Sequence, residues 1–399
     1  MAKRIRQGTV IAVAGLLAAA TACTGQQSTP PGFAGRHLSA EHGASGAGGG
    51  GADTARPFTL LASGDVLPHS SVIDRAAADA GGKGYDFRPM LKGAAPLVSG
   101  ADLAICHMET VYGQKGGPYT GYPSFKSPPE VATALHATGF DSCSTASNHS
   151  LDDGVPGIGR TLDALDRAGV AHAGSARSAA EAGRPTLLRA GTGKKAAKVA
   201  HLAYTYGTND NPVPLDQPWA VNLIDKDRIV ADARAARRAG ADVVVLSLHW
   251  GTEWQEAPDD VQLGLGRELT ASVTGDRPDI DLILGTHAHV PQAYEKVNGT
   301  WIVYGMGDQI AGAMVNHEGA QDPRGNESSM GRFTFAPPRS QGQRWTVSKA
   351  EFIPQWFDTE AGRVVPLGAP AQRLREVRDR IRGVVLSRGA AQAGLVMGK

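Results

Sequence analysis

The sequence predicts an α/β domain built around a largely parallel β-sheet. Between about residues 57 and 354, short apolar runs alternate with segments of helical periodicity, as in strand–helix units. The runs are rich in Val, Ile and Leu, which is typical of strands buried on both faces. Several end in polar side chains, and the carboxyl ends of parallel strands open onto the crevice where α/β proteins bind ligands. The same pattern therefore predicts both a fold class and the place of a site.

Five apolar runs deliver candidate functional side chains at their ends. Residues 58–65 end at Asp65, which Gly64 allows to follow a tight turn. The other runs and the residues they bring are 101–109 with His107 and Glu109, 140–149 with Asn148 and His149, 246–251 with His249, and 280–290 with His287 and His289. We expect these side chains to converge at one edge of the fold.

The residue types at these strand ends favour a metal site. They are oxygen and nitrogen ligands without a thiolate, which is typical of catalytic rather than structural sites for one or two divalent ions, such as Mn, Zn, Fe or Mg. An isolated histidine after a strand is more often simply hydrogen-bonded, but the close pair His287 and His289 after Gly285 favours ligands. Asn148 could instead cap or turn the chain, and Glu109 could orient a ligand histidine without binding the ion.

The segments between and after these runs complete the expected order. Glycines that can end a helix follow three predicted helices: 131–136, 157–166 and 225–239. Strands are expected at 198–204 and 301–304, a polar, mobile loop beside the site at 311–330, a hairpin at 331–354 and a basic amphipathic helix at 369–389. Among the other histidines, His136 is expected on a solvated helix face, and His172 and His201 as hydrogen-bonded strand residues.

The first part of the 399-residue chain is not expected to belong to a domain. Basic residues precede an apolar run at 10–20 and a small-residue segment that ends at Cys23, which indicates a signal peptide over 1–23 with a lipobox-like cleavage site. Residues 24–56 are rich in Gly, Ser, Ala and Pro and predict a flexible tether. We therefore expect a folded domain over 57–354 and a C-terminal extension over 355–399. A lipid would hold the protein at the outer face of the cell membrane; secretion without a lipid is the alternative.

Net charge and cysteine content bear on two questions: whether the protein binds nucleic acid and whether disulfides hold its fold together. The formal net charge is +1, from 40 basic and 39 acidic residues, so nothing calls for a nucleic-acid partner. Only Cys106 and Cys143 fall in the predicted domain, too few for a disulfide framework. Two buried thiols are favoured over a single bridge between neighbouring strands.

Four segments together resemble the CapA family of capsule-synthesis proteins, a branch of the calcineurin-like metallophosphoesterases. They are Ala146-Ser-Asn-His-Ser-Leu-Asp-Asp-Gly154, Gly159-Arg-Thr-Leu-Asp-Ala-Leu165, His249-Trp-Gly-Thr-Glu-Trp254 with Pro258 and Gln262, and Gly285-Thr-His-Ala-His-Val-Pro-Gln292. The resemblance covers about 58–352. It implies a four-layer α/β/β/α sandwich with the ligands gathered at one edge of the two sheets.

The resemblance also implies roles for particular residues. Asp65 and His289 would bind a first metal, and Glu109 would take the bridging position. Asn148, His249 and His287 would bind a second metal. His149 would stand beside the substrate as a general acid or as a stabiliser of transition-state charge.

Three positions differ from the metallophosphoesterase or CapA pattern. Leu67 stands where metallophosphoesterases usually have the histidine of Asp-x-His, which the CapA branch generally lacks too. A first metal would then lose one ligand and bind more weakly, unless His69 or His107 compensates. The family commonly has Asn-Leu-Glu where this chain has His107-Met-Glu109, and Gly-Asn where it has Gly307-Asp308. These changes leave the ligand set open, including the alternative of a single metal ion.

The resemblance implies a function at the cell surface. The first hypothesis is a metal-dependent hydrolase acting on an anionic polymer such as poly-γ-glutamate, or on a small anionic substrate. The alternative is a non-catalytic protein that binds or exports the polymer within a membrane-bound synthesis complex.

Overall fold

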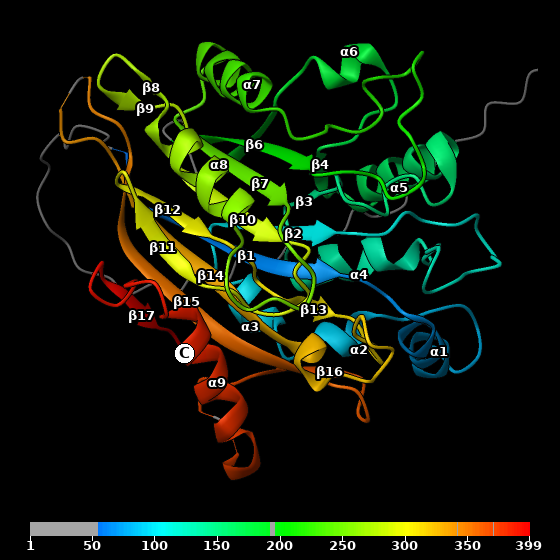
Figure 1. The fold of residues 1–399 in the computed structure, drawn as a ribbon. Coiled ribbons are helices and arrows are strands. Elements are labelled where there is room, and N and C mark those ends of the chain that lie inside the picture. The colour runs from blue at the N-terminus through cyan, green and yellow to red at the C-terminus, as the bar shows by residue number, and fades with distance from the viewer. Residues whose placement is uncertain (1–54, 192–195, 341, 370) are drawn as a thin grey trace, which may run out of the picture. The chain divides into compact units, whose positions relative to one another are not determined.

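The computed structural model describes residues 55–191, 196–340, 342–369 and 371–399, which hold two large β-sheets (Figure 1). The first has the order β16-β15-β14-β1-β2-β3-β4, with β13 beside β1 and β17 beside β15. Its strands are β1 (Phe58–Val66), β2 (Leu103–Met108), β3 (Ser142–Ser144), β4 (Ala171–Ala173), β13 (Asp308–Ile310), β14 (Glu327–Ala336), β15 (Thr346–Asp358), β16 (Arg363–Pro366) and β17 (Leu395–Met397).

The second sheet has the order β11-β12-β10-β7-β6-β5. Its strands are β5 (Thr186–Ala190), β6 (Ala197–Thr205), β7 (Val243–His249), β10 (Leu282–Thr286), β11 (Tyr294–Val297) and β12 (Thr300–Val303). A separate two-stranded ribbon pairs β8 (Val273–Thr274) with β9 (Arg277–Pro278).

The helices connect these strands. They are α1 (Ser70–Asp79), α2 (Arg88–Leu91), α3 (Ala95–Val98), α4 (Glu130–Thr138), α5 (Gly154–Ala168), α6 (Ala179–Ala182), α7 (Lys226–Arg238), α8 (Asp260–Ala271) and α9 (Arg375–Val385), with 3-10 turns η1 (Pro323–Asn326) and η2 (Gln372–Leu374). The predicted helices at 131–136, 157–166 and 225–239 are confirmed as α4, α5 and α7. Each is followed by its glycine at positive φ, +108° at Gly139, +81° at Gly169 and +95° at Gly240.

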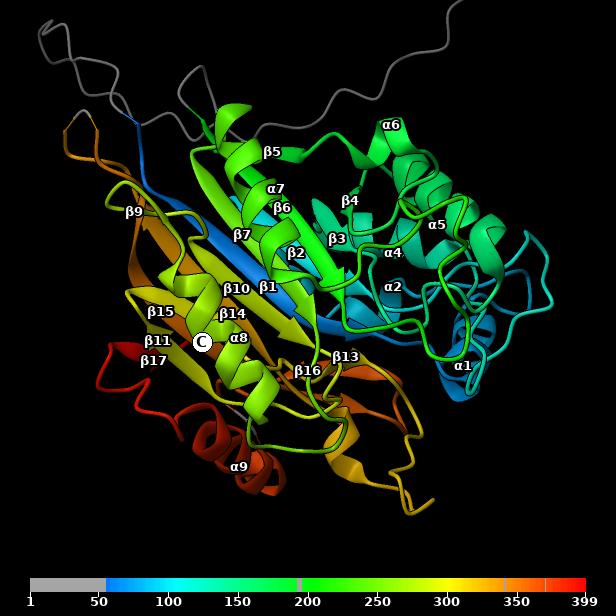
Figure 2. The ribbon, with the colours of Figure 1, turned by 45° about the horizontal axis from the view of Figure 1, so that its top comes forward.

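The alternation of side chains along the strands produces the layers. In β1, Leu60 and Ala62 face the second sheet, whereas Leu61 packs on the helices of the opposite face. In β7, Val243 and Val245 pack between the sheets, and the intervening Val244 packs under α7 and α8. Figure 2 shows α7 and α8 over the second sheet. The four-layer α/β/β/α sandwich is therefore confirmed.

Both sheets are mixed at their edges. The runs β1-β2-β3-β4 and β6-β7-β10-β12 are parallel, as predicted, but β14, β15 and β16 are antiparallel, and so are β5 and β11. The predicted hairpin at 331–354 is confirmed as β14 and β15. Residues after 354 continue the same sheet through β16 and β17, and α9 packs on β14 and β15.

The polar segment 311–330 is only partly a loop. Its last four residues belong to β14, where Ser329 and Met330 are buried. The polar groups are satisfied inside the protein, because Tyr294 Oη lies 3.0 Å from Ser329 Oγ and the buried Glu327 pairs with Arg380 of α9. The polarity of these last four residues reflects internal hydrogen bonding rather than exposure, which is why the predicted loop is too long.

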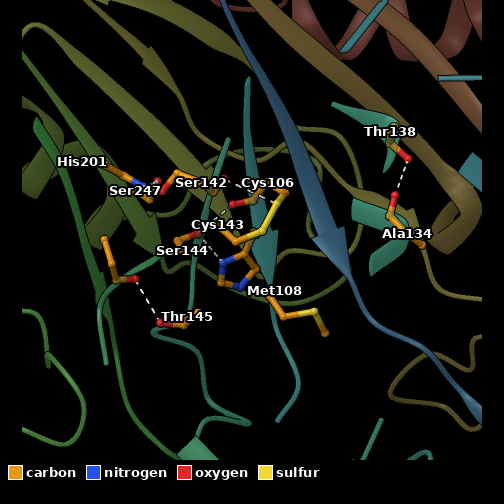
Figure 3. Close-up of a disulfide and its surroundings, with 12 residues drawn as sticks. Cys106, Met108, Ala134, Thr138, Ser142, Cys143, Ser144, Thr145, His201 and Ser247 are labelled. Atoms are coloured by element: carbon orange, nitrogen blue, oxygen red, sulfur yellow. Dashed lines mark hydrogen bonds between the residues drawn. A yellow bond between two sulfur atoms is a disulfide. The ribbon is translucent and has the colours of Figure 1, made fainter. Parts of the chain in front are cut away.

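Cys106 and Cys143 form a disulfide bridge, so the expectation of two buried thiols is wrong (Figure 3). The two residues are register partners on the adjacent parallel strands β2 and β3, with Cα atoms 4.4 Å apart. Strand pairing places their side chains at the same level, which the sequence could not reveal. Beside the bridge, His201 lies between Ser142 and Ser247 and is hydrogen-bonded to both, as expected of a strand histidine.

The predicted signal peptide, Cys23 and nearly all of the tether lie outside the described residues. Within the described ranges, no helix has the length and apolar character needed to cross a membrane.

Candidate metal centre

The predicted site residues meet where strands of both sheets end. Asp65 lies near the end of β1, Glu109 follows β2, and Asn148 and His149 follow β3. From the second sheet, His249 ends β7, and His287 and His289 follow β10. All seven side chains are buried.

Asp65 reaches the cluster because β1 runs against the segment that precedes β13. Asp65 N–H donates to the Gly307 carbonyl at 3.1 Å. A Cβ at Gly64 would lie 1.7 Å from that same carbonyl oxygen, so only glycine allows the approach. Asp65 Oδ2 in turn accepts a hydrogen bond of 3.1 Å from the His287 backbone N–H. One carboxylate thus ties the two sheets together at the site.

His249 is held between two polar neighbours. Its Nδ1 lies 3.0 Å from Thr286 Oγ1, and its Nε2 lies 3.0 Å from Asn148 Oδ1. A Glu109 carboxylate oxygen lies 3.7 Å from the same Nε2. Because Asn148 offers its oxygen to this imidazole from the other sheet, both could bind one ion.

The two histidines after β10 adopt unusual backbone conformations. His287 has φ +93° and His289 has φ +58°, in the region that non-glycine residues rarely occupy. Gly285 allows the preceding turn, since a Cβ there would lie 1.9 Å from the Tyr304 carbonyl oxygen. His289 Nδ1 lies 3.0 Å from Asp308 Oδ1. The strained turn aims both imidazoles at the cluster.

The donors form overlapping groups whose ligand atoms lie within 4.8 Å of one another. The largest has four buried members: Asp65, Glu109, His289 and Asp308. The other three are Glu109 with His249 and His287, Asp65 with His107 and His249, and Glu253 with His287 and His289. Glu109 belongs to the four-membered group and to the group of His249, so it lies between the two halves of the cluster.

Several of these donor atoms are buried without any hydrogen-bond partner among the described residues. They are Asp65 Oδ1, both carboxylate oxygens of Glu109, Asp308 Oδ2, His107 Nε2 and His287 Nδ1. Buried polar atoms are rarely left unpaired, because each costs free energy. A divalent cation would satisfy them together, so these residues fit a metal ion.

The pKa values of the buried carboxylates also favour a bound cation. Burial, and then the charge of Asp308, raise the pKa of Asp65 well above its usual range. Burial, and then Asp65, do the same to the pKa of Glu109, and burial raises the pKa of Asp308. Crowded carboxylates resist ionising together unless a cation is present.

The histidines respond in two ways. Burial, and then the neighbouring imidazoles, lower the pKa values of His249 and His287, and burial lowers the pKa of His107 to about 3. The lowered pKa values favour the neutral imidazole, which is the form that binds metals. Burial alone would lower the pKa of His289, but the carboxylates of Asp308 and Glu109 outweigh it and raise that pKa.

His149 is positioned differently from the other histidines. Its Nδ1 lies 2.7 Å from Asp152 Oδ2, which also accepts the Phe125 backbone N–H at 2.7 Å. The Phe125 ring packs edge-on against the imidazole, with centroids 4.7 Å apart. The carboxylate holds one ring nitrogen and leaves Nε2 available for other contacts.

Four residues that the sequence left unassigned or uncertain lie in the cluster. His107 is a member, held by a 2.7 Å contact from Nδ1 to Ser144 Oγ, whereas His69 is in none of the four groups found among the described residues. Asp308 could have been found from its departure from the family Gly-Asn, and Glu253 from its place in the motif after His249. Tyr206, 50% exposed with its ring 4.5 Å from that of His287, had no sequence signal.

The sequence is similar to known proteins over much of its length. Residues 59–313 match the family described as bacterial capsule synthesis protein PGA_cap. The chain is 28% identical over 219 residues to a probable polyglutamine synthesis accessory protein of Mycobacterium tuberculosis, covering 52% of this chain and 55% of that protein. It is 27% identical over 181 residues to the PGA biosynthesis protein CapA of Bacillus subtilis, covering 45% of each. The chain thus spans about half the length of the curated relatives it matches.

Among solved structures, the chain is similar to the calcineurin-like phosphoesterase YfkN of Bacillus subtilis. The TM-score is 0.46 at 14% identity, over 82% of this chain and 98% of that one. The family match covers more than half of the sequence, including the strands that carry Asp65, Glu109 and His249. The chain belongs to the bacterial capsule synthesis protein family PGA_cap.

Proposed function

We propose that this protein is a metal-dependent hydrolase that acts on an anionic cell-surface polymer of the poly-γ-glutamate class. The observation that carries the proposal is the set of buried, unpaired carboxylate and imidazole atoms at the junction of the two sheets. The names of the relatives, which refer to polyglutamine synthesis and PGA biosynthesis, support the choice of substrate.

The donors divide into two sets that would hold two ions. Asp65, Glu109, His289 and Asp308 form a carboxylate-rich set, which suits a hard ion such as Mn²⁺ or Mg²⁺. In this set Asp308 would supply the ligand that Leu67 cannot. Glu109 would also belong to the second set, with Asn148, His249 and His287, whose imidazoles suit Zn²⁺ or Fe²⁺.

A divalent ion at this position would act as a Lewis acid, lowering the pKa of water and polarising the oxygen of the bond to be broken. His149 would donate a proton or a hydrogen bond from Nε2 to the departing group, because Asp152 holds Nδ1 and fixes the ring orientation. Tyr206 and Glu253, which are partly exposed beside the histidines, would border the entrance for substrate.

We also propose that the protein works at the outer face of the membrane, held by a lipid on Cys23 and spaced from it by the tether of residues 24–56, as part of a synthesis complex. The basic n-region, the apolar run and the small residues before Cys23 support the anchor. The disulfide between Cys106 and Cys143 supports an oxidising compartment.

The test combines metal analysis with hydrolysis assays. Purified protein is expected to bind one or two ions per chain and to cleave γ-glutamyl peptides or a generic phosphodiester only when loaded. His149→Ala should lower the rate constant by about 100-fold or more while the metal content stays unchanged. His136→Ala, on the exposed face of α4, is the matched control and should change neither.

A non-catalytic role in holding or exporting the polymer is the second candidate, because the names of the relatives describe synthesis rather than cleavage. Full metal occupancy with no bond cleaved, together with normal polymer production by the His149→Ala variant, would establish this second role and reject the hydrolase.

A further inference from the structure

Tyr206 lies at the metal centre, but a place at the entrance does not use its hydroxyl group. Tyr206 follows β6, which runs parallel to β7 with Thr205 as the register partner of His249. The Tyr206 backbone N–H donates to the His249 carbonyl at 3.0 Å, and Thr205 Oγ1 donates to the Gly207 carbonyl at 2.9 Å. These bonds fix the backbone around Tyr206, so the end of β6 presents this side chain at the same edge as the other strand ends.

The Tyr206 ring packs on the imidazole-rich half of the centre. Its centroid lies 4.5 Å from that of His287 and 6.4 Å from that of His249, with the planes of the second pair 16° apart. Tyr206 is 50% exposed, whereas His249 and His287 are only 1% and 3% exposed. The tyrosine therefore lies on the solvent side of these imidazoles, where a substrate arriving from solution can touch it.

The residues that act on the Tyr206 phenol belong to the metal centre. Burial, and then the carboxylates of Glu253 and Glu109, raise the pKa of Tyr206 to about 12, and hydrogen bonding by the Asn148 side chain acts in the opposite direction. A hydrogen bond that lowers the pKa of a phenol is donated to the phenol oxygen. Tyr206 keeps its proton at neutral pH, as an unperturbed tyrosine also would, and is a hydrogen-bond donor.

The hydroxyl hydrogen of Tyr206 is free for a substrate. Two neighbouring tyrosines use theirs inside the protein, since Tyr204 Oη donates to Asp232 at 2.7 Å and Tyr304 Oη donates to Glu295 at 2.9 Å. In the part of the chain that the structure describes, no group accepts a hydrogen bond from the Tyr206 hydroxyl. Packing alone would not require a hydroxyl at this position.

Two donors of different kinds thus serve the same centre. His149, with Nδ1 held by Asp152, was assigned to the departing group. Hydrolysis also places negative charge on a second atom, the carbonyl or phosphoryl oxygen of the bond that breaks. A neutral phenol suits this oxygen, because it stabilises the charge by a hydrogen bond without giving up its proton.

We propose that Tyr206 donates its phenol O–H to the substrate oxygen that gains negative charge as the bond breaks, which in a γ-glutamyl amide is the carbonyl oxygen. The proton stays on the phenol, and the proton needed by the leaving nitrogen comes from His149. The inference rests on the proposed hydrolase function and assigns that reaction a substrate contact from the second sheet.

The first test measures the hydrolysis of a γ-glutamyl peptide by the full chain loaded with Mn²⁺. Tyr206→Phe keeps the ring on His287 and removes only the phenol oxygen. Its kcat is expected to fall about 100-fold while KM changes by less than about threefold, because the hydrogen bond strengthens as charge develops. The metal content should equal that of the wild type, since Tyr206 is not among the proposed ligands.

Two further variants separate the hydroxyl from the ring. Tyr206→Leu removes both and should lower kcat at least as far as Tyr206→Phe does. The matched control is Tyr85→Phe, which removes a phenol oxygen from a ring that packs edge-on against Tyr119 with centroids 5.1 Å apart, and it should keep the wild-type kcat and KM. A wild-type kcat in Tyr206→Phe beside a lowered kcat in Tyr206→Leu would make Tyr206 a packing residue and overturn the proposal.

A binding measurement without bond cleavage separates this contact from the hydrolase itself. Inorganic phosphate, a tetrahedral anion, is titrated by calorimetry into the Mn²⁺-loaded wild type and Tyr206→Phe. The variant is expected to bind phosphate about tenfold more weakly, because it has lost a hydrogen bond to a charged group. If the wild type binds phosphate more tightly but cleaves no peptide, the hydrolase fails and the phenol contact stands. Equal phosphate affinities would overturn the contact, whereas peptide cleavage by the wild type would still support the hydrolase.

Discussion

Asp308 adds a negative charge to the carboxylate-rich set of donors. Its Oδ1 contacts His289 Nδ1 at 3.0 Å, and its Oδ2 is buried without a partner beside Asp65 and Glu109. An asparagine at this position, as the family commonly has, would orient the histidine but bring no charge. The aspartate makes the first set of donors more negative, which offsets the ligand lost at Leu67.

Asp308→Asn should therefore weaken binding of the ion held by the carboxylate-rich set by about 10- to 100-fold. The measurement is a titration of metal-free protein with Mn²⁺, followed by calorimetry. Asp276→Asn, at a fully exposed carboxylate, is the control and should titrate as the wild type does. An unchanged Mn²⁺ affinity in Asp308→Asn would remove Asp308 from the ligand set.

At the scale of elements, close contacts between backbone segments fix the positions of the site residues at the strand ends. Trp250 Nε1 donates to the Tyr304 carbonyl at 2.9 Å, and Gly285 of β10 fits against both groups. The space is small enough that no side chain can be added at Gly285. The turn that carries His287 and His289 depends on this contact.

Gly285→Ala should lower the free energy of unfolding by about 1–3 kcal/mol or more, because the new Cβ would overlap the Tyr304 carbonyl. Gly159→Ala is the contrast, since a Cβ at this position in α5 meets nothing within 4 Å and helix propensity should stabilise it by about 0.5–1 kcal/mol. The free energies of unfolding of Gly285→Ala and Gly159→Ala are measured by urea denaturation. Equal values for the two variants would contradict the steric argument.

The disulfide joins the two strands that supply Glu109 and Asn148. It closes a loop with a sequence separation of 37 residues. Reducing it, with the thiols then blocked, should cost about 2–4 kcal/mol of unfolding free energy, since the unfolded chain gains freedom. Coincident urea curves for oxidised and reduced protein, or free thiols found by mass spectrometry in the purified protein, would argue against the bridge.

The sequence predicted the elements and most of the candidate site because both follow local patterns. Apolar runs ending in His, Asp or Asn marked the strand ends, and glycines marked the ends of α4, α5 and α7. What it could not reveal depends on pairing between distant segments. Strand register brought Cys106 to Cys143, and the packing of β13 beside β1 brought Asp308 to Asp65.

At the scale of the whole molecule, the centre exists only where the two sheets meet. Asp65, Glu109 and Asn148 come from the first sheet, and His249, His287 and His289 come from the second. Neither sheet alone carries a complete set of donors. Any change that shifts one sheet against the other should therefore alter metal binding before it unfolds either sheet.

The proposed lipid anchor at Cys23 can be tested by substitution. Cys23→Ala should move the protein from the membrane fraction to the soluble fraction or the medium, because the cysteine is the only proposed site for the lipid. Immunoblots of fractionated cells measure the shift. Ser28→Ala in the tether is the control, and retention of the Cys23→Ala protein in membranes would refute lipid anchoring.

The left-handed backbone at His287 and His289 lowers the stability of the fold while it places both imidazoles in the candidate metal centre. A non-glycine residue in this region costs of order 1–3 kcal/mol, which glycine would avoid. His287→Gly should thus raise the free energy of unfolding and remove one imidazole from the candidate metal centre. Selection for heat resistance alone would drive this chain away from its capacity to hold metal.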